Sequence, residues 1–472
     1  AHEIAILALW LTKHQMNVEF FKEFGRTNPT LPLTDAGNIV QGNACRLEWE
    51  EVCPKKENDE VYILGNPPYI GGKSQSKEQK QDMSFVFNGL KKFKELDYIT
   101  CWFVLASKYT QNYNSIKFAF VTTSSICEGA QVEQLWPLIS KNGNEINFAY
   151  KPFNWTNNAR DKAGVTVSIL GLRNKTTLPK LIFEENRKRE VKHINGYLTA
   201  ARDIYITKRA VPFSNLPVVI TGNSPYEGGN LMLTVVEKNE LIYNYPSSSI
   251  LIRKVSGANE FINGIERYCL WISDDNLKLA LSIPPISKRI DNIRELRLNG
   301  GEVARGLAKR PHQFRYTHTG VTSVLIIPIV SSSRREYIPF GLVPKETIIL
   351  SSAAAAYNTS PFVLSIISSK IHLIWLKLTA GRLRGDIRYL SALSYNTFPF
   401  PIISENRKEE LTQCTLKILD ERLKHSEKTL AQLYDPDKMP EGLKEAHHQN
   451  DLAVERCYRS TPFSSDEERL EY

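Results

Sequence analysis

VYILGNPPYI, residues 61–70, joins a short apolar run to an asparagine, two prolines and a tyrosine. The run from Val61 to Leu64 is typical of a short buried β-strand. A proline has no N–H to donate to a sheet ladder, so the strand must end at Asn66. For an arbitrary Asn-Pro pair, a Pro-rich turn that leaves a sheet is the simplest interpretation.

The four residues after this strand could also act together on a ligand. Pro67 and Pro68 restrict φ, so the backbone carbonyls of the tetrapeptide are held rigidly, and Asn66 adds an amide oxygen. Two fixed oxygens form an acceptor pair for an amino group with two N–H donors, while Tyr69 offers a flat face for stacking. Such a pair would stabilise the positive charge that develops when the amine attacks a methyl group, without a general base.

Because no base is needed, the two nearby carboxylates, Asp82 and Asp97, are expected to have surface or helix-capping roles.

Chain length predicts two or three domains, since 472 residues exceed one ordinary domain. The formal net charge of +9 is compatible with a polyanionic partner but is common among proteins.

Cysteine usage and hydropathy indicate the cellular compartment. The 7 cysteines occur singly, without a CxxC pair, so reduced intracellular thiols and no metal site are expected. The longest apolar run, IAILALWL at 4–11, is far shorter than the about 20 residues of a membrane span. We therefore expect a cytoplasmic protein without a membrane partner. The sequence leaves the oligomeric state open, a monomer included.

The first half of the chain alternates between strand-like and helix-like segments. Ile4, Leu7, Ala8 and Leu11 recur at helical spacing, which predicts an amphipathic helix that packs on a sheet. Segments separated by helical stretches predict a mostly parallel sheet with covering helices. In such sheets, ligands bind beyond the carboxyl ends of the strands, where Asn66 lies. The strand-like segments are 61–65, 118–123, 146–153 and 166–172.

Asn66-Pro67-Pro68-Tyr69 resembles the catalytic tetrapeptide of amino-group methyltransferases that use S-adenosylmethionine, chiefly adenine-N6 DNA enzymes. It also resembles that of glutamine-N5 protein methyltransferases. Further segments resemble MmeI-like (Type IIL) restriction-modification methyltransferases, and nearly the whole chain then fits. They include ALWLTKHQMN (8–17), FVTTSSICEGAQVEQLWP (120–137), FAYKPFNWTNNARDKAGVTVSILGL (148–172), GNSPYEGGNLML (222–233) and LYDPDKMPEGLKEAH (433–447).

The resemblance implies an α/β fold in three parts. Residues 1–178 would form a partial Rossmann-like class I S-adenosylmethionine-dependent methyltransferase sheet, 179–403 an α+β target-recognition domain, and 404–472 a C-terminal helical segment. The implied activity is site-specific adenine-N6 methylation of double-stranded DNA with S-adenosylmethionine as the methyl donor. The residues implied as catalytic are Asn66, Pro67, Pro68 and Tyr69.

The resemblance also implies roles for three residues outside the tetrapeptide. Asn43, in IVQGNA, stands where the family more often has an aspartate near the adenine of the donor. Phe153, or else Trp155, falls where an aromatic ring packs on a flipped adenine opposite Tyr69. Alternatively, Asn43 caps a turn and the two aromatic residues belong to an ordinary core.

Arginines cluster with polar and aromatic residues in the second half, where the alternating pattern fades. Arginine suits both phosphate and bidentate contact with guanine. A solvated basic surface is the alternative for any single cluster. Three clusters in a chain that also carries a base-modifying motif favour a DNA-binding recognition domain. The clusters are RPHQFRYTH (310–318), SSSRREY (331–337) and GRLRGDIRY (381–389). The contacts are expected from Arg310, Arg334, Arg335, Arg382, Arg384 and Arg388.

The glycine-rich turn that normally binds the donor has no candidate. No glycine precedes Gly25, and in the resembled family this turn comes just before the helix that here begins the chain. We therefore expect an N-terminally incomplete piece that lacks the donor-binding strands and any nuclease domain, and that alone does not methylate. A non-catalytic DNA-binding or specificity fragment and a glutamine-N5 protein methyltransferase remain as alternatives.

Overall fold

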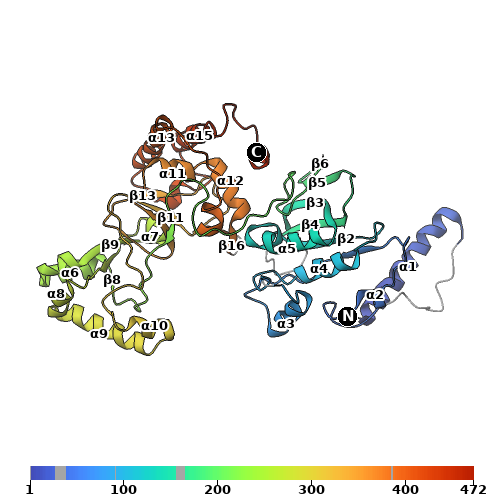
Figure 1. Cartoon of the computed structure of the whole chain (residues 1–472), viewed down its shortest axis with the longest axis horizontal. Coiled ribbons are helices and arrows are strands. Elements are labelled where there is room, and N and C mark those ends of the chain that lie inside the picture. Colours follow the sequence, from blue (N-terminus) through green and yellow to red (C-terminus); the bar gives the residue numbers. More distant parts are fainter. Residues whose placement is uncertain (1, 27–38, 91, 156–164, 384–385) are drawn as a thin grey trace. The chain divides into compact units, whose positions relative to one another are not determined.

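The computed structural model describes residues 2–26, 39–90, 92–155, 165–383 and 386–472 (Figure 1). The chain divides into two compact units. Unit 1 comprises residues 1–127 and 131–205, and unit 2 comprises 128–130 and 206–472.

Unit 1 is built on a mixed six-stranded sheet with the order β1-β2-β4-β3-β5-β6. β1, β2, β3 and β5 run in one direction, while β4 lies antiparallel between β2 and β3 and β6 is antiparallel to β5. The four strand-like segments of the sequence therefore all form strands. The strands are β1 (Tyr62–Gly65), β2 (Lys117–Thr123), β3 (Asn144–Trp155), β4 (Val165–Asn174), β5 (Lys180–Glu184) and β6 (Arg187–Val191).

One face of this sheet is covered by helices. Phe103 of α4 (Thr100–Tyr109) packs edge-on against Phe118 and Phe120 of β2, with ring centroids 6.2 and 5.3 Å away. Trp136 of α5 (Gly129–Lys141) contacts the same Phe103 ring at 6.2 Å. These aromatic side chains are buried and form the core of unit 1. Shorter helices, α2 (Trp49–Val52) and α3 (Lys77–Val86), complete this part of the unit.

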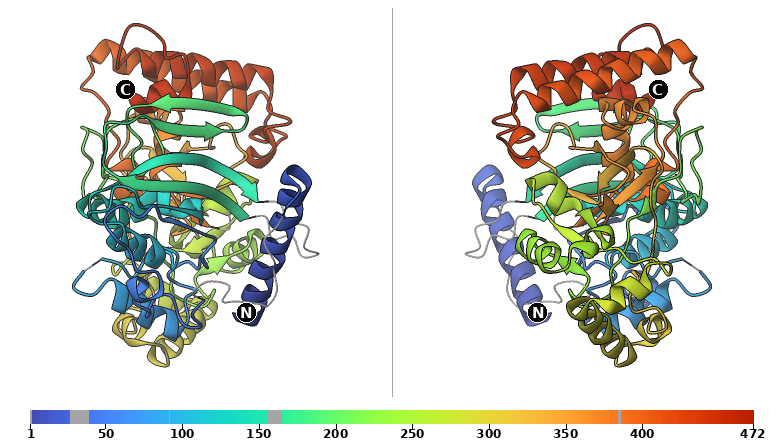
Figure 2. Two further views of the ribbon diagram at one scale, coloured as in Figure 1. Left: turned by 90° about the vertical axis from the view of Figure 1, so that its right-hand side faces the viewer. Right: turned by 90° about the vertical axis from the view of Figure 1, so that its left-hand side faces the viewer.

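The other face carries apolar side chains on five strands, and no helix of the described residues covers it. We call this surface the open face. Its depression measures about 490 Å³. Figure 2 shows α1 (His2–Phe24) beside these strands and not over them. The open face consists of Leu64, Ala119, Val121, Phe148, Tyr150, Ile169, Leu181 and Phe183.

Two expectations about the N-terminal part are wrong. The helix at residues 2–24 forms, but none of its residues is buried, so it does not pack on the sheet. β1 is an edge strand and not a buried one, since Tyr62 is 56% exposed and Leu64 is 73% exposed. Both corrections have one physical cause: within the described residues, no element lies over the open face or beside the free edge of β1.

Unit 2 contains three small sheets and most of the helices. Its hydrophobic core surrounds β11 (Val324–Pro328), in which every residue is buried, and the alanine-rich β15 (Ala353–Tyr357). The sheet orders are β14-β9-β10-β8, β13-β11-β15-β7 and β12-β17-β16. The remaining strands are β7 (Ile220–Thr221), β8 (Met232–Leu233), β9 (Ile252–Ser256), β10 (Tyr268–Leu270), β12 (Val330–Ser331), β13 (Gly341–Val343), β14 (Ile348–Ile349), β16 (Gly381–Leu383) and β17 (Asp386–Arg388).

The helices of unit 2 form two groups by their order along the chain. The first group is α6 (Val235–Asn244), α7 (Ala258–Asn263), α8 (Leu277–Ser282), α9 (Pro284–Leu298) and α10 (Glu302–Leu307). The second is α11 (Phe362–Ile367), α12 (Lys370–Thr379), α13 (Glu405–Leu423), α14 (Leu430–Leu433), α15 (Glu441–Glu455) and α16 (Asp466–Glu471). In Figure 1, α6, α8, α9 and α10 lie together, whereas α7 lies near β11 and β13. α13 packs against α11 and α15. None of the helices in the described ranges is both long and apolar enough for a membrane crossing.

Candidate active site and nucleic-acid interface

The tetrapeptide lies directly beyond the carboxyl end of β1. Gly65 is the last paired residue of that strand, opposite Phe120, and Asn66 follows it. The Asn66 side chain is exposed, and its amide makes no hydrogen bond to another described residue. Pro67 is buried, whereas Tyr69 is partly exposed. The end of the strand thus presents an amide that has no partner among the described residues, on a backbone that contains a buried proline.

Hydrogen bonds fix the backbone directly after Tyr69. The carbonyl of Ile70 accepts from the N–H of Tyr98 and from Nε2 of Gln75, both at 3.0 Å. The same Gln75 nitrogen donates to the carbonyl of Leu96 at 3.0 Å. Gln75 is buried and was not expected from the sequence, because a glutamine in a Gly- and Ser-containing loop carries no periodic signal. Hydrogen bonds to the segment that leads into α4 therefore fix the backbone at the end of the tetrapeptide.

Asp97 is buried in this supporting segment. Its carboxylate accepts the N–H of Ile99 at 3.3 Å, but Ile99 and not Asp97 is the N-cap of α4 and no side chain caps that helix, so the expected surface or helix-capping role is wrong. Burial raises the pKa of Asp97 to about 6, although backbone hydrogen bonds from Ile99, Ile70 and Tyr98 act in the opposite direction. Asp97 is thus a positioning group behind the tetrapeptide.

Asp97→Asn is expected to change how the stability of unit 1 depends on pH. The folded unit retains a proton on Asp97 that the unfolded chain, with a pKa near 3.8, has released. The stability from this proton is present below about pH 4 and is lost as the pH rises to about 6, a change of about 3 kcal/mol. The asparagine variant should not show this loss. Urea unfolding between pH 4 and 7 measures it, with the exposed Asp203→Asn as control; parallel profiles for parent and Asp97→Asn would contradict it.

The prediction that Asp82 lies at the surface or caps a helix is wrong. Asp82 is buried and accepts hydrogen bonds from three side chains, one of which is Asn43. Its carboxylate accepts from Asn43 Nδ2 at 2.9 Å, Arg46 Nε at 2.7 Å and the Tyr98 hydroxyl at 2.7 Å. Burial by itself would raise the pKa of Asp82, but these hydrogen bonds outweigh it and lower the pKa. Asn43 Oδ1 meanwhile accepts the N–H of Cys45 at 2.9 Å. Both ends of the Asn43 amide are therefore engaged in a turn.

Phe153 and Trp155 lie at the same end of the sheet as Asn66. Phe153 pairs with Val167 of the neighbouring strand β4, and Val167 in turn pairs with Thr123, the last residue of β2. Both aromatic side chains are 37% exposed, so they do not belong to the core. Three strand spacings of about 4.8 Å separate β3 from β1, about 14 Å in all. Stacking of a base between Tyr69 and Phe153 therefore stays a prediction that depends on how the loops reach across β2 and β4.

Two of the three arginine clusters meet in the sheet β12-β17-β16. Val330 and Ser331 pair with Arg388 and Ile387, so the segment that follows β12 lies beside β17. Arg388 is exposed and without a hydrogen-bond partner among the described residues. Arg335 donates to Ser331 Oγ at 3.2 Å, and burial lowers the pKa of its guanidinium. The exposed Arg334 pairs with Asp437 at 2.8 Å. The Arg382 side chain and the whole of Arg384 lie outside the described residues.

The third cluster lies among the first group of helices, where Arg310 folds back on its own loop. Its guanidinium donates to the carbonyls of Phe314 and Arg315 at 3.2 and 2.7 Å. Arg297 of α9, which sequence patterns missed, is 0% exposed and organises this region. Its five hydrogen bonds, between 2.8 and 3.2 Å, reach the carbonyls of Pro225, Tyr226, Leu307, Arg310 and Gln313.

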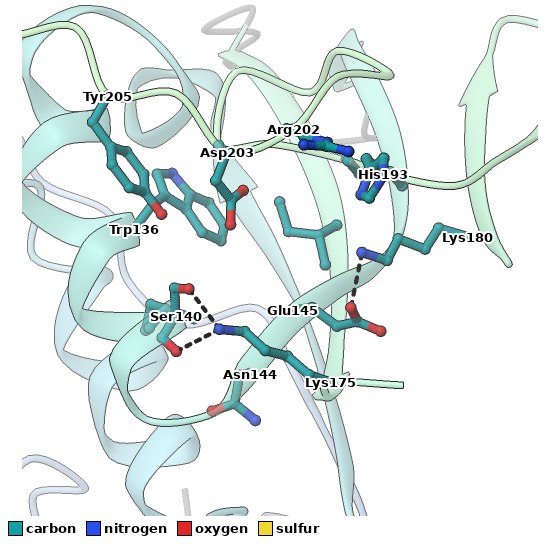
Figure 3. A pocket seen from close by; sticks show the side chains of 14 residues that line it. Trp136, Ser140, Asn144, Glu145, Lys175, Lys180, His193, Arg202, Asp203 and Tyr205 are labelled. Carbon is teal, nitrogen blue, oxygen red and sulfur yellow. Dashed lines mark hydrogen bonds and ion pairs between the residues drawn. The ribbon is translucent and has the colours of Figure 1, made fainter. Parts of the chain in front are cut away.

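A polar pocket of about 290 Å³ lies at the opposite end of the sheet of unit 1 (Figure 3). It opens beside Asn144 and Lys180, which begin β3 and β5, whereas Asn66 follows the carboxyl end of β1. Lys180 pairs with Glu145 at 2.8 Å, and Lys175 donates to Ser140 Oγ at 2.9 Å. Because ligands of such sheets bind at the carboxyl ends, this pocket is separate from the tetrapeptide site. No group of side chains suited to metal binding occurs in the part of the chain that the structure describes.

Comparison with protein families divides the chain into three consecutive matches. Residues 1–184 match the model described as "MmeI, DNA-methyltransferase domain", 200–402 match "MmeI, target recognition domain", and 403–472 match "MmeI, C-terminal domain". The chain belongs to the MmeI family. The family assignment confirms the resemblance and the α/β fold class, with a methyltransferase domain followed by a target-recognition domain and C-terminal helices.

Two relatives of this MmeI-family chain are informative. "DNA methyltransferase A" of Bacillus subtilis (strain 168) is 44% identical over 476 residues, a match that covers 100% of this chain and 54% of that protein. The structure of the Type IIL restriction-modification enzyme MmeI in complex with DNA is 35% identical, with a TM-score of 0.82, and the match covers 98% of this chain and 62% of that one. The chain thus spans just over half the length of the curated relative.

Proposed function

We propose that this chain is the methyl-transferring and DNA-reading part of a restriction-modification enzyme that methylates N6 of adenine in duplex DNA. The observation that carries the proposal is the free amide of Asn66 at the carboxyl end of β1, in the region matched by the DNA-methyltransferase domain. S-adenosylmethionine is the proposed methyl donor. Asn66, Pro67, Pro68 and Tyr69 are the proposed catalytic residues, and Phe153 is the proposed stacking partner.

The proposed mechanism assigns the chain's residues to the acceptor amine. The Asn66 amide oxygen and the adjacent Pro67 carbonyl accept the two N–H bonds of the exocyclic amine, which localises its lone pair. Tyr69 stacks on the extruded base, because an adenine inside a duplex is out of reach. Gln75 and Asp97 keep the tetrapeptide backbone in place. The positive charge on the attacking nitrogen is stabilised by the two oxygens, and its proton then leaves to solvent.

The described residues do not form a complete donor site. Asn43, the proposed contact to the donor, uses both ends of its amide on Asp82 and Cys45. No described glycine-rich turn connects a strand to a helix ahead of β1, although such turns hold nucleotide-like cofactors.

The reaction class can be tested by isotope transfer. The chain, joined to the part of the Bacillus subtilis relative that the match does not cover, is incubated with duplex DNA and methyl-labelled S-adenosylmethionine. Enzymatic digestion of the DNA should then release labelled N6-methyladenine. Label on cytosine, label on the polypeptide alone, or a donor-bound protein that transfers nothing to DNA would each overturn the proposal.

Arg388→Ala is expected to weaken duplex binding about threefold to tenfold and to reduce the salt dependence by about one counterion. Arg388 is exposed on β17 and has no hydrogen-bond partner among the described residues, so its charge is available to a phosphate or a base. Fluorescence anisotropy with labelled duplex at several salt concentrations measures both effects. Arg294→Ala removes an arginine that pairs with Asp291 on α9 and serves as the control. Equal affinities for Arg388→Ala and the parent at every salt concentration would contradict the prediction.

A further inference from the structure

The polar pocket at the opposite end of the unit 1 sheet gathers basic side chains from three parts of the chain (Figure 3). They come from the segment that follows β4, from the start of β5 and from residues 193–202, which follow β6. Four basic side chains face two carboxylates, so the lining carries a net positive charge even when the histidine is neutral. The basic residues are Lys175, Lys180, His193 and Arg202, and the acidic ones are Glu145 and Asp203.

The carboxylate of Glu145 is already paired and leaves a positive charge beside the pocket. Its Oε1 lies 3.1 Å from Arg173 Nε, and its Oε2 lies 2.8 Å from Lys180 Nζ. Both cationic side chains are only 9% exposed. Two buried cations therefore share one carboxylate. A surplus charge in a partly buried place is costly unless an anion or water compensates it.

Lys180 also has N–H donors to spare. An ammonium group carries three N–H donors, and Glu145 is the single acceptor for Lys180 among the described residues. Buried donors are seldom left without an acceptor. Figure 3 shows the Lys180 nitrogen at the wall of the pocket, where its two remaining N–H bonds can meet an acceptor of a ligand.

A tight loop at residues 193–202 shapes another wall of the pocket. The buried Asn195 holds this loop, because its Oδ1 accepts the N–H of Tyr197 at 3.0 Å and its Nδ2 donates to the Arg202 carbonyl at 3.4 Å. Leu198 adopts a φ of 60°, in the left-handed region that costs energy for a residue with a side chain. The loop is thus held in one specific conformation.

The pocket has a cationic side and an acidic side. Figure 3 shows Lys180, His193 and Arg202 together on one side, and Asp203 and Tyr205 on the other. Neither the His193 ring nor the Arg202 guanidinium has a hydrogen-bond partner among the described residues. Between the two sides, the lining is partly apolar and includes Ile139, Ile146 and Ile194.

The end of α5 by itself disfavours an anion, and Lys175 compensates for it. α5 ends at Lys141, and the carbonyl end of a helix carries a partial negative charge. Lys175 Nζ donates to the carbonyl and to Oγ of Ser140, at 3.0 and 2.9 Å. The ammonium group thus neutralises the helix end that borders the pocket.

These groups fit a phosphate monoester better than a carboxylate. A phosphate monoester carries a charge of about −1.5 to −2 at pH 7 and three acceptor oxygens, which match three N–H-bearing side chains. A carboxylate carries one charge and two oxygens. The pocket volume of about 290 Å³ is at the lower limit of ligand pockets and suits an organic body of sugar size. Hydroxyl groups on such a body can donate to Asp203.

We propose that this pocket binds a small phosphate monoester with a hydroxyl-bearing body, such as a pentose phosphate. The phosphoryl group contacts Lys180, His193 and Arg202, while a hydroxyl group donates to the Asp203 carboxylate. The ligand holds residues 193–205, the last segment of unit 1, against the beginnings of β3 and β5. The site is separate from Asn66 and does not depend on the proposed methyl transfer.

The first test is calorimetric titration of the chain with ribose 5-phosphate. One molecule should bind with a dissociation constant below about 1 mM, inorganic phosphate should bind at least about threefold more weakly, and ribose should not bind. His193→Ala and Arg202→Ala should each weaken ribose 5-phosphate about tenfold, because each removes a hydrogen bond to a charged group. Both residues are exposed, so both variants should fold. Arg187→Ala is the matched control, since this exposed arginine of β6 does not line the pocket.

Asp203→Ala distinguishes the two ends of the ligand. The variant should weaken ribose 5-phosphate about threefold to tenfold, because a hydroxyl group loses its acceptor. It should not weaken inorganic phosphate, since it removes a negative charge from the lining.

Hydrogen exchange provides a readout on the protein itself. With ribose 5-phosphate bound, the amides of residues 193–205 should exchange with deuterium at least about threefold more slowly. Arg202→Ala at the same ligand concentration should show less of this protection, whereas Arg187→Ala should show all of it.

Four outcomes would overturn the proposal. The first is neither heat nor altered exchange at ribose 5-phosphate concentrations up to about 10 mM. The second is binding that neither His193→Ala nor Arg202→Ala weakens, which would place the ligand elsewhere. The third is inorganic phosphate that binds as tightly as ribose 5-phosphate, with no effect of Asp203→Ala, which would make this a site for simple anions. The fourth is duplex DNA that displaces ribose 5-phosphate and that Arg202→Ala weakens equally, which would make the DNA backbone the occupant.

Discussion

Asn66→Ala is expected to lower methyl transfer to duplex DNA about a thousandfold while changing the affinity for DNA less than about threefold. The variant removes one of the two oxygens proposed to hold the acceptor amine, and deletion of a group that acts mainly in the transition state costs rate and not binding. The Asn66 amide makes no hydrogen bond to another described residue, so its loss should not destabilise unit 1. Single-turnover transfer and anisotropy, both on the fused protein, measure the two quantities separately.

Two further variants sharpen this result. Asn66→Asp keeps an acceptor oxygen and should retain more activity than Asn66→Ala. Asn88→Ala changes another exposed asparagine of unit 1 and should transfer at the parental rate. A normal rate for Asn66→Ala would show that the acceptor-pair mechanism is wrong. A parallel loss of DNA affinity would instead make Asn66 a general binding residue.

The edge of unit 1 that carries Asn66 could be predicted from the sequence because its signals are local. Two consecutive prolines must end a strand, and β1 does end at Gly65, immediately before Asn66. The apolar runs of β2, β3 and β4 likewise formed strands within two residues of their expected ends. The antiparallel insertion of β4 was not foreseen, because strand order depends on pairing between distant segments.

The incorrect and missed predictions concern features that depend on contacts between residues distant in the sequence. The sequence at 61–64 predicts a buried strand, and its apolar character is correct, but burial requires a neighbour that the described residues do not provide. Gln75, Asp82 and Asp97 each make a hydrogen bond to a residue more than 15 positions away along the chain. No periodicity in the sequence predicts such a contact. Arg297 was missed for the same reason, since a lone arginine on a helix usually faces solvent.

Arg297→Met is expected to destabilise unit 2 by about 4 kcal/mol and to abolish specific DNA binding. The methionine keeps an unbranched apolar stem but is shorter and donates no hydrogen bond, so five buried carbonyls lose their donor. Unsatisfied buried acceptors cost about 1–3 kcal/mol each, partly recovered by relaxation and water. Two separate segments, 225–226 and 307–313, would no longer be tied to α9. Urea unfolding and competition binding between specific and random duplexes measure the effects.

The neighbouring Arg294→Ala provides the matched control for this prediction. Arg294 lies on the same helix three residues earlier, is exposed, and pairs only with Asp291 in the described chain, so its loss should cost less than about 0.5 kcal/mol. Arg297→Lys keeps the positive charge with fewer donors and should fall between the parent and Arg297→Met. If Arg297→Met unfolds like Arg294→Ala, the five carbonyls are not stabilised by the guanidinium. If it loses stability but still distinguishes specific from random duplex, the loop that contains Arg310 does not read DNA.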